Sequence, residues 1–334
     1  MRIATLKDIA SRAGVSITTV SNVVNGNYNR VSPSNVKRIQ ALIEECHYVP
    51  NQSARSLTNK STNMIGIIIQ SEYMTNSLTD SYVGEFVGSV VLHLQRLGYD
   101  SLIRMTNDYV DINRSLRKWN LAGAIFTGTY DRYIRDLAED TRIPFIFTDS
   151  YSSSRRINNV GVDDFRGGVL AAEHLLKMGH RRIAFIAPGL HKSEVDEQRK
   201  NGFLSALGRF GLKENGDYLM PTSDSGMEMA EMLMDMSPPV TAAFVTADRA
   251  AIRLIDALKE LGKRVPDDYS IVGFDNIELG QYATPPLTTV AQAIQRKAKV
   301  AVDILVRHIE NPYAPPENIL IDVSLLERGS VRRL

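Results

Sequence analysis

Four charged residues of this 334-residue sequence, Asp149, Arg199, Asp248 and Asp275, stand where polar side chains can bind a small solute. The three aspartates directly follow the apolar runs PFIFT, AAFVTA and SIVGF, which are typical of buried strands. An arginine that faces carboxylates can hold the hydroxyls or the carboxylate of a small molecule. Each residue could instead cap a helix or form an ion pair between lobes, and the pattern alone leaves both interpretations open.

A second polar group lies on one face of a short segment near the N-terminus. At 100° per residue, the opposite face is apolar and contains Val20, Val23 and Val24, whereas the polar face consists of Ile17, Thr18, Ser21, Asn22 and Asn25. Amide, hydroxyl and methyl groups of this size suit the DNA major groove, where Asn pairs with adenine and Thr or Ile contacts the thymine methyl. A three-helix bundle with a merely solvated polar face is the alternative.

The charge distribution favours DNA. Residues 1–60 contain eight Lys and Arg residues and three acidic residues, and the remainder of the chain has a net charge of −4. A small basic region on a mildly acidic body indicates contact with a polyanion, although surface lysines that aid solubility would give the same sign.

The sequence contains no motif that indicates catalysis, a metal or a cofactor. It has no GxxxxGK[ST], no HExxH, and no GxGxxG after a strand, and its single cysteine, Cys46, excludes an internal disulfide or a cysteine-rich metal site. No apolar run approaches the roughly 20 residues that cross a bilayer, and the N-terminus lacks the apolar stretch of a signal peptide. We therefore expect a cytoplasmic, non-enzymatic protein that needs no cofactor and does not contact a membrane.

Local signals predict the elements that position both polar groups. Thr5 with Asp8 predicts the N-cap of a first helix, Gly14 ends it, Ser16 caps a second helix that ends near Val24, and Ser32-Pro33 starts a third. From Ile65 onward, short β-rich runs alternate with helical stretches, including helices at Val83–Leu97, near Tyr133–Ala138, to Met178, through Phe203–Phe210 and at Ala250–Leu261. The alternation predicts two doubly wound α/β lobes with a cleft at the carboxyl ends of their strands.

The segment TLKDIASRAGVSITTVSNVVNG, followed by YVPNQSARSL, resembles the headpiece and hinge of the LacI/GalR family of bacterial regulators. The resemblance implies that Ile17, Thr18 and Asn22 contact bases, that Ser16, Thr19, Ser21 and Asn25 lie near phosphates, and that Thr5 also contacts DNA. It further assigns Asn51, Ala54, Arg55 and Leu57 to a hinge helix whose leucine is inserted into the minor groove. From the residues alone, an ordinary flexible linker is equally compatible.

The body also resembles this family, in segments such as HLLKMGHRRIAFI, ELGKRVPDDYSIVGFDN and LLERGSVRRL. The resemblance implies an all-α helix-turn-helix headpiece at 1–49, a hinge at 50–61, and a periplasmic-binding-protein-like effector and dimerisation domain at 62–334. The first lobe would comprise about 62–163 and 293–322, and the second about 164–292 and 323–334. Asp149, Arg199 and Asp275 would bind the effector, with Gln70 and Thr127 also lining the pocket.

The resulting hypothesis is a repressor of a carbohydrate-utilisation operon that binds a pseudo-palindromic double-stranded operator. The tail after Arg328 is too short for the heptads that form tetramers, so we expect a homodimer. The effector would be a sugar, a sugar acid or a sugar phosphate. A cytosolic solute-binding protein and a global regulator that uses a protein corepressor are the alternatives.

Overall fold

The computed structural model describes residues 4–48, 62–70, 78–106, 112, 116, 118–128, 143–151, 157–188, 193–212, 219–220 and 225–334. Its contacts divide the chain into two units, Met1–Thr62 and Asn63–Leu334. The predicted hinge at 50–61 and the predicted helix near Tyr133–Ala138 lie outside the described residues.

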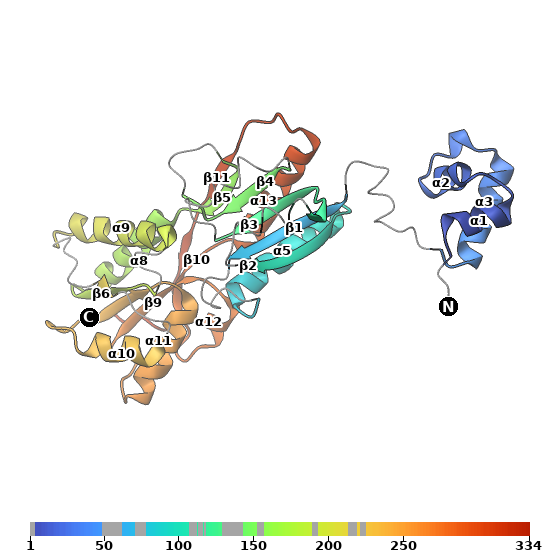
Figure 1. The fold of residues 1–334 in the computed structure, drawn as a ribbon. Helices are drawn as coiled ribbons and strands as arrows, with labels where there is room; N and C mark the ends of the chain where they lie inside the picture. Colours follow the sequence, from blue (N-terminus) through green and yellow to red (C-terminus); the bar gives the residue numbers. More distant parts are fainter. Residues whose placement is uncertain are drawn as a thin grey trace. The chain divides into compact units, whose positions relative to one another are not determined.

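The N-terminal unit contains three short helices around one small core (Figure 1). Its elements are α1 (Leu6–Ala13), α2 (Ile17–Val24), the 3₁₀ turn η1 (Tyr28–Arg30) and α3 (Pro33–Glu45). Gly14 adopts φ 63° and ψ 36° at the end of α1, a left-handed conformation that favours glycine. Ser16 caps α2, and its hydroxyl accepts a hydrogen bond from the Thr19 amide. The predicted helix-turn-helix is confirmed.

Thr5 and Asp8 form the predicted capping box, because the Asp8 amide donates to Thr5 Oγ1 and the Thr5 amide donates to Asp8 Oδ2 at 2.8 Å. We expect Thr5→Ala to lower the stability of α1 by about 1 kcal/mol, because the Asp8 amide loses the hydroxyl oxygen that accepts its hydrogen bond. Amide hydrogen exchange of the full-length protein measures this loss locally. Thr18→Ala, at an exposed position inside α2, is the matched control and should leave exchange unchanged within a few tenths of a kcal/mol. Equal protection in both variants would contradict the capping role.

The larger unit contains two six-stranded sheets within the described residues. In spatial order, the first sheet consists of β11 (Asn318–Ile321), β5 (Asn159–Val162), β4 (Phe145–Thr148), β3 (Gly123–Thr127), β1 (Met64–Gln70) and β2 (Asp100–Thr106). The second consists of β12 (Ser324–Leu326), β10 (Thr288–Ala291), β9 (Ser270–Asp275), β8 (Ala242–Val245), β6 (Ile183–Ile186) and β7 (Leu219–Met220). All pairings are parallel except that of β12 with β10.

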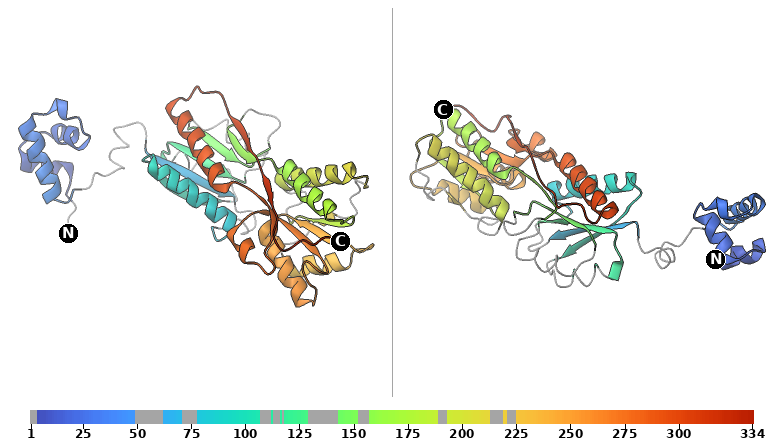
Figure 2. Two further views of the ribbon diagram at one scale, coloured as in Figure 1. Left: turned by 180° about the vertical axis from the view of Figure 1, so that it is seen from behind. Right: turned by 90° about the horizontal axis from the view of Figure 1, so that it is seen from above.

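Helices cover these sheets, as two-sided burial requires (Figure 2). The helices α5 (Ser81–Arg96) and α13 (Ile294–Glu310) pack together on the first sheet, and α8 (Asp164–Lys177) and α9 (Glu194–Arg209) on one face of the second. The opposite face of the second sheet packs against α10 (Gly226–Met234) and α11 (Asp248–Glu260), and the short α12 (Glu278–Tyr282) contacts α11. Along β6, Ile183 and Phe185 face one layer while Ala184 and Ile186 face the other, the two-residue alternation of a strand buried on both sides.

The chain passes between the two sheets three times. It leaves the first sheet after β5, returns between β10 and α13, and leaves again between β11 and β12. Residues at the carboxyl ends of β3, β4 and β9 line a pocket between the lobes. No helix among the residues that the structure describes combines the length and the apolarity needed to cross a bilayer.

Candidate functional site

A cavity of about 290 Å³ lies between the two lobes and is lined by residues from both. The first lobe contributes Asp80, Tyr82, Val83, Phe86, Thr127, Gly128, Thr148 and Asp149. The second contributes Ser193, Glu194, Val195, Asp196, Arg199, Thr246, Ala247, Arg249, Asp275 and Ile277, and Gln292 comes from the connection between β10 and α13. The lining of the cavity is rich in hydroxyl, carboxylate and guanidinium groups, and these groups suit a small polar ligand.

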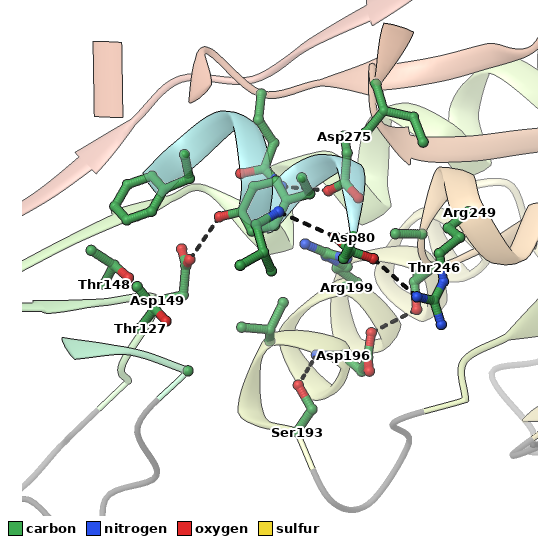
Figure 3. A pocket seen from close by; sticks show the side chains of 18 of the residues that line it. Asp80, Thr127, Thr148, Asp149, Ser193, Asp196, Arg199, Thr246, Arg249 and Asp275 are labelled. Carbon is green, nitrogen blue, oxygen red and sulfur yellow. Dashed lines mark hydrogen bonds and ion pairs between the residues drawn. The ribbon is translucent and has the colours of Figure 1, made fainter. Parts of the chain in front are cut away.

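The structure brings Thr127, Asp149, Arg199 and Asp275 together at this cavity (Figure 3). Thr127 and Asp149 come from the ends of β3 and β4, Asp275 ends β9, and Arg199 lies on α9. Asp149 has φ 58° and Asp275 has φ 120°, backbone values that are uncommon outside glycine. Backbone strain of this kind clusters at binding sites, so its presence on both walls supports a ligand site here. The side chain of Gln70, which ends β1, lies outside the described residues.

Arg199 lies among three buried carboxylates. Its Nε donates to Asp164 Oδ1 at 2.8 Å, and its guanidinium carbon stacks 3.6 Å from the centre of the Phe274 ring. Burial opposes the charged form of Arg199, but Asp164, Asp275 and Asp196 together raise its pKa above the ordinary value. The arginine is therefore a permanent cation at the second-lobe wall.

The carboxylates around Arg199 are strongly desolvated. Burial raises the pKa of Asp164, Asp196 and Asp275 above the ordinary aspartate value, and the charge of Arg199 opposes each increase. Asp196 accepts a hydrogen bond of 2.6 Å from the Thr246 hydroxyl, and Asp164 accepts one from the Tyr151 hydroxyl. Of these three carboxylates, Asp196 and Asp275 line the cavity and give the second-lobe wall oriented acceptors for ligand hydroxyls.

The structure does not place Asp248, which was predicted to bind the effector, in the lining of this cavity. Asp248 is 0% exposed at the first residue of α11, where it accepts from the Thr289 hydroxyl at 2.6 Å and from the Ile277 amide at 3.0 Å. Burial raises its pKa to about 7, although these hydrogen bonds favour the carboxylate. Through these hydrogen bonds, its carboxylate holds the turn after β9 beside the N-terminus of α11.

Sequence reasoning also placed α9 too late, at Phe203–Phe210, whereas the helix begins at Glu194 with Ser193 as its N-cap. The Ser193-Glu194 start with further acidic residues in the first turn was the signal that could have located it. The earlier start brings Ser193 and Asp196 to the cavity together with Arg199.

The sequence analysis missed two other contributions to the site. Arg249 Nη1 lies 3.3 Å from Asp80 Oδ2, an ion pair between α11 and the N-cap of α5 that joins the lobes. Lys297, fully buried on α13, donates to Asp149 Oδ1 at 2.6 Å. A lysine on the mainly aliphatic stripe of a helix was the sequence signal for this second contact.

The proposed DNA-contacting residues of the headpiece lie on the outer face of α2 and at helix starts. Ile17 is 48% exposed, Thr5, Ser16, Thr18 and Asn25 are exposed, and Thr19, Ser21 and Asn22 are half-buried. Val20 and Val23 are buried in the headpiece core, as the helical spacing predicts. The hinge residues Asn51, Ala54, Arg55 and Leu57 lie outside the described residues.

Known protein families match both the N-terminal helical unit and the larger α/β unit. A family model described as bacterial regulatory proteins, lacI family, matches residues 5–51, and one described as a periplasmic binding protein-like domain matches residues 172–331. The transcriptional repressor PurR of Aliivibrio salmonicida is 30% identical, with 99% of this chain and 100% of that protein covered, and the probable repressor ExuR of Bacillus subtilis is 32% identical, with 99% of each covered.

A solved structure of the lac repressor dimer bound to operator and the anti-inducer ONPF matches with a TM-score of 0.88 and 27% identity, covering 99% of this chain and 100% of that one. Fold and site thus define a DNA-binding transcriptional repressor with an effector-type domain, and this class is not enzymatic. The chain belongs to the LacI family of bacterial regulatory proteins.

Proposed function

We propose that this protein represses a carbohydrate-utilisation operon. A small hydroxylated effector that binds between the lobes lowers or raises its affinity for the operator. The observation that supports this best is the cavity itself, where Asp149 and Asp275 on opposite walls and the Arg199 fork offer both acceptors and donors to vicinal hydroxyls. An effector held by both lobes biases their relative orientation, which is the physical basis of coupling to DNA binding.

A purine effector is the second candidate, because relatives are named PurR. Among the described lining residues, the aromatic rings are those of Tyr82 and Phe86, both on α5, and the Tyr82 hydroxyl is bonded to Asp149. The lining is dominated instead by hydroxyl and charged groups, which favours a sugar or sugar derivative.

For the DNA side, we propose that Ile17, Thr18 and Asn22 contact base edges and that a homodimer presents two headpieces to a pseudo-palindrome. The exposure of Ile17 and Thr18 on α2 supports this, as does the likeness to a dimeric lac repressor structure. Sedimentation of mostly tetramer at micromolar concentration would contradict the dimer.

Selection of bound duplexes from a random DNA library by the purified full-length protein, without added ligand, tests the proposal. Enrichment of a symmetric site is the expected result, and binding should fall steeply with salt because phosphate contacts release counterions. A folded protein that enriches no sequence would contradict direct operator recognition. A chain lacking residues 1–60 is the control, since a solute-binding protein would keep its function while a repressor loses its operator.

With the selected site in hand, Asn22→Ala should change which bases are preferred at the position it contacts and weaken binding by about 1–3 kcal/mol, the discrimination of one bidentate base contact. Asn25→Ala is the matched control: it removes the same amide from an exposed position near the end of α2 and should weaken all sequences uniformly. Repeating the selection with each variant measures both effects. An unchanged preference in Asn22→Ala would remove this residue from base recognition.

A further inference from the structure

Lys297 is a charged residue in an apolar setting. It lies in the first turn of α13, whose buried face consists mainly of aliphatic residues such as Ile294, Ala298, Ala301 and Leu305. Its side chain is 0% exposed. Burying an ammonium group is strongly unfavourable unless it is paired and hydrogen-bonded, so its partners must compensate for the lost hydration.

Three side chains share the protons of the ammonium. Lys297 Nζ donates to both carboxylate oxygens of Asp149, to the Tyr82 hydroxyl at 2.6 Å and to Gln292 Oε1 at 3.4 Å. Tyr82 in turn donates to Asp149 Oδ2 at 3.1 Å. Asp149 lies on the first-lobe wall of the pocket, and its charge is therefore compensated by a lysine that does not itself line the cavity.

Gln292 continues this chain of hydrogen bonds to the other lobe. It lies in the connection between β10 of the second sheet and α13, which packs on the first, and its Nε2 donates to Asp275 Oδ1. A glutamine amide has its acceptor at one end and its donor at the other. Because Lys297 occupies the acceptor, the donor end faces Asp275.

We propose that Lys297 and Gln292 form a relay that couples Asp149 to Asp275, and hence the two lobes, across the effector pocket. The inference rests on the proposed function, because it names the device that would transmit an effector contact on one wall to the other. Lys297 acts here as a positioning residue. Displacing Asp149 moves the ammonium, the ammonium releases the Gln292 amide, and Asp275 loses its oriented donor.

The relay also limits what Asp149 can bind. An ionised carboxylate offers about four lone-pair sites, and Asp149 receives two hydrogen bonds from Lys297 and one from Tyr82. The remaining site accepts one ligand hydroxyl. A ligand ammonium gains little there, because the charge of Asp149 is already compensated.

A mutant cycle in the full-length protein tests the relay without requiring the effector or DNA. The cycle compares Asp149→Asn, Asp275→Asn and the double variant in four backgrounds: unchanged, Gln292→Leu, Lys297→Met and the control Lys299→Met. Urea unfolding is followed by the fluorescence of Trp119, the one tryptophan of the chain, which packs against the apolar cluster of the first lobe. Lys299→Met is a matched control background, because this lysine lies on the same helix but pairs with Asp303 at the exposed surface.

In the unchanged and Lys299→Met backgrounds, the double variant should deviate from the product of the single effects on the unfolding equilibrium constant by at least about threefold. In Gln292→Leu and Lys297→Met the deviation should fall below about twofold. Multiplicative effects in the unchanged background would overturn the relay, as would a coupling that persists in Gln292→Leu, which would indicate direct electrostatic interaction. If Lys297→Met does not fold, Gln292→Leu decides the outcome, since it removes no charge.

This cycle reports only on the effector domain, whereas the selection experiment reports on DNA recognition. A failed cycle with an enriched operator would refute the relay and leave the repressor proposal intact. A positive cycle without any enriched operator would support the relay and contradict direct operator recognition.

Discussion

Replacing Asp164 by asparagine is expected to lower the free energy of unfolding of the effector domain by about 3 kcal/mol. Asp164 is buried at the first residue of α8 and is the direct partner of Arg199, whose Nε donates to it at 2.8 Å. Removing one member of a buried ion pair typically costs about 3–5 kcal/mol, because the other charge is left unpaired. We expect the lower end, since Asp196 and Asp275 still act on Arg199 electrostatically.

Urea unfolding of the full-length protein, followed by circular dichroism, measures this loss. The control is Glu173→Gln on the same helix, which removes a carboxylate whose partners, Lys177 and Arg209, are exposed; it should cost less than about 1 kcal/mol. A loss below about 1 kcal/mol for Asp164→Asn would mean that solvent or other groups satisfy Arg199.

The second large effect concerns the close crossing of α8 and α9, which places Arg199 beside Asp164. A Cβ added at Gly202 would lie 1.9 Å from the carbonyl oxygen of Phe165, and one added at Gly168 would lie 2.0 Å from that of Arg199. Both clashing atoms are backbone, so the helices would have to separate. We therefore expect Gly202→Ala to destabilise the domain by about 3 kcal/mol, the upper end of typical overpacking costs.

Gly88→Ala is the matched control for this prediction. Gly88 also lies inside a helix, α5, but a Cβ there would meet no atom within 4 Å. The same substitution should be stabilising by about 0.5–1 kcal/mol at that site, because alanine is the better helix former. Thermal or urea unfolding of both variants measures the contrast. If Gly202→Ala left the stability unchanged, the close contact between α8 and α9 would not limit packing at this position. If Gly88→Ala were destabilising, the general effect of alanine in a helix could not serve as the reference.

Much of the headpiece could be predicted from the sequence because its signals are local. The Thr5 capping box, the Gly14 turn, the Ser16 cap and the valine face of α2 all involve residues within one or two helical turns. The α/β lobes were predictable for a related reason, since each strand that is buried on both faces is a short, nearly continuous apolar run. The strands β2, β7, β10, β11 and β12 were not predicted. Residues of β2, β11 and β12 are partly exposed, and β11 pairs with β5, which is distant in the chain.

For the pocket, the sequence determined which residues could reach the strand ends, and Thr127, Asp149, Arg199 and Asp275 do line the cavity. It did not determine how they are compensated. Lys297 and Asp149 are 148 residues apart, and Arg249 and Asp80 are 169 apart, so no local pattern contains either pair. Asp248 has the same sequence context as Asp149 yet points into the protein, because the turn at Asn276 and Ile277 folds back over it. Short-range periodicity and capping specified the elements, whereas only the tertiary packing of the two lobes decided which charges face the ligand and which face each other.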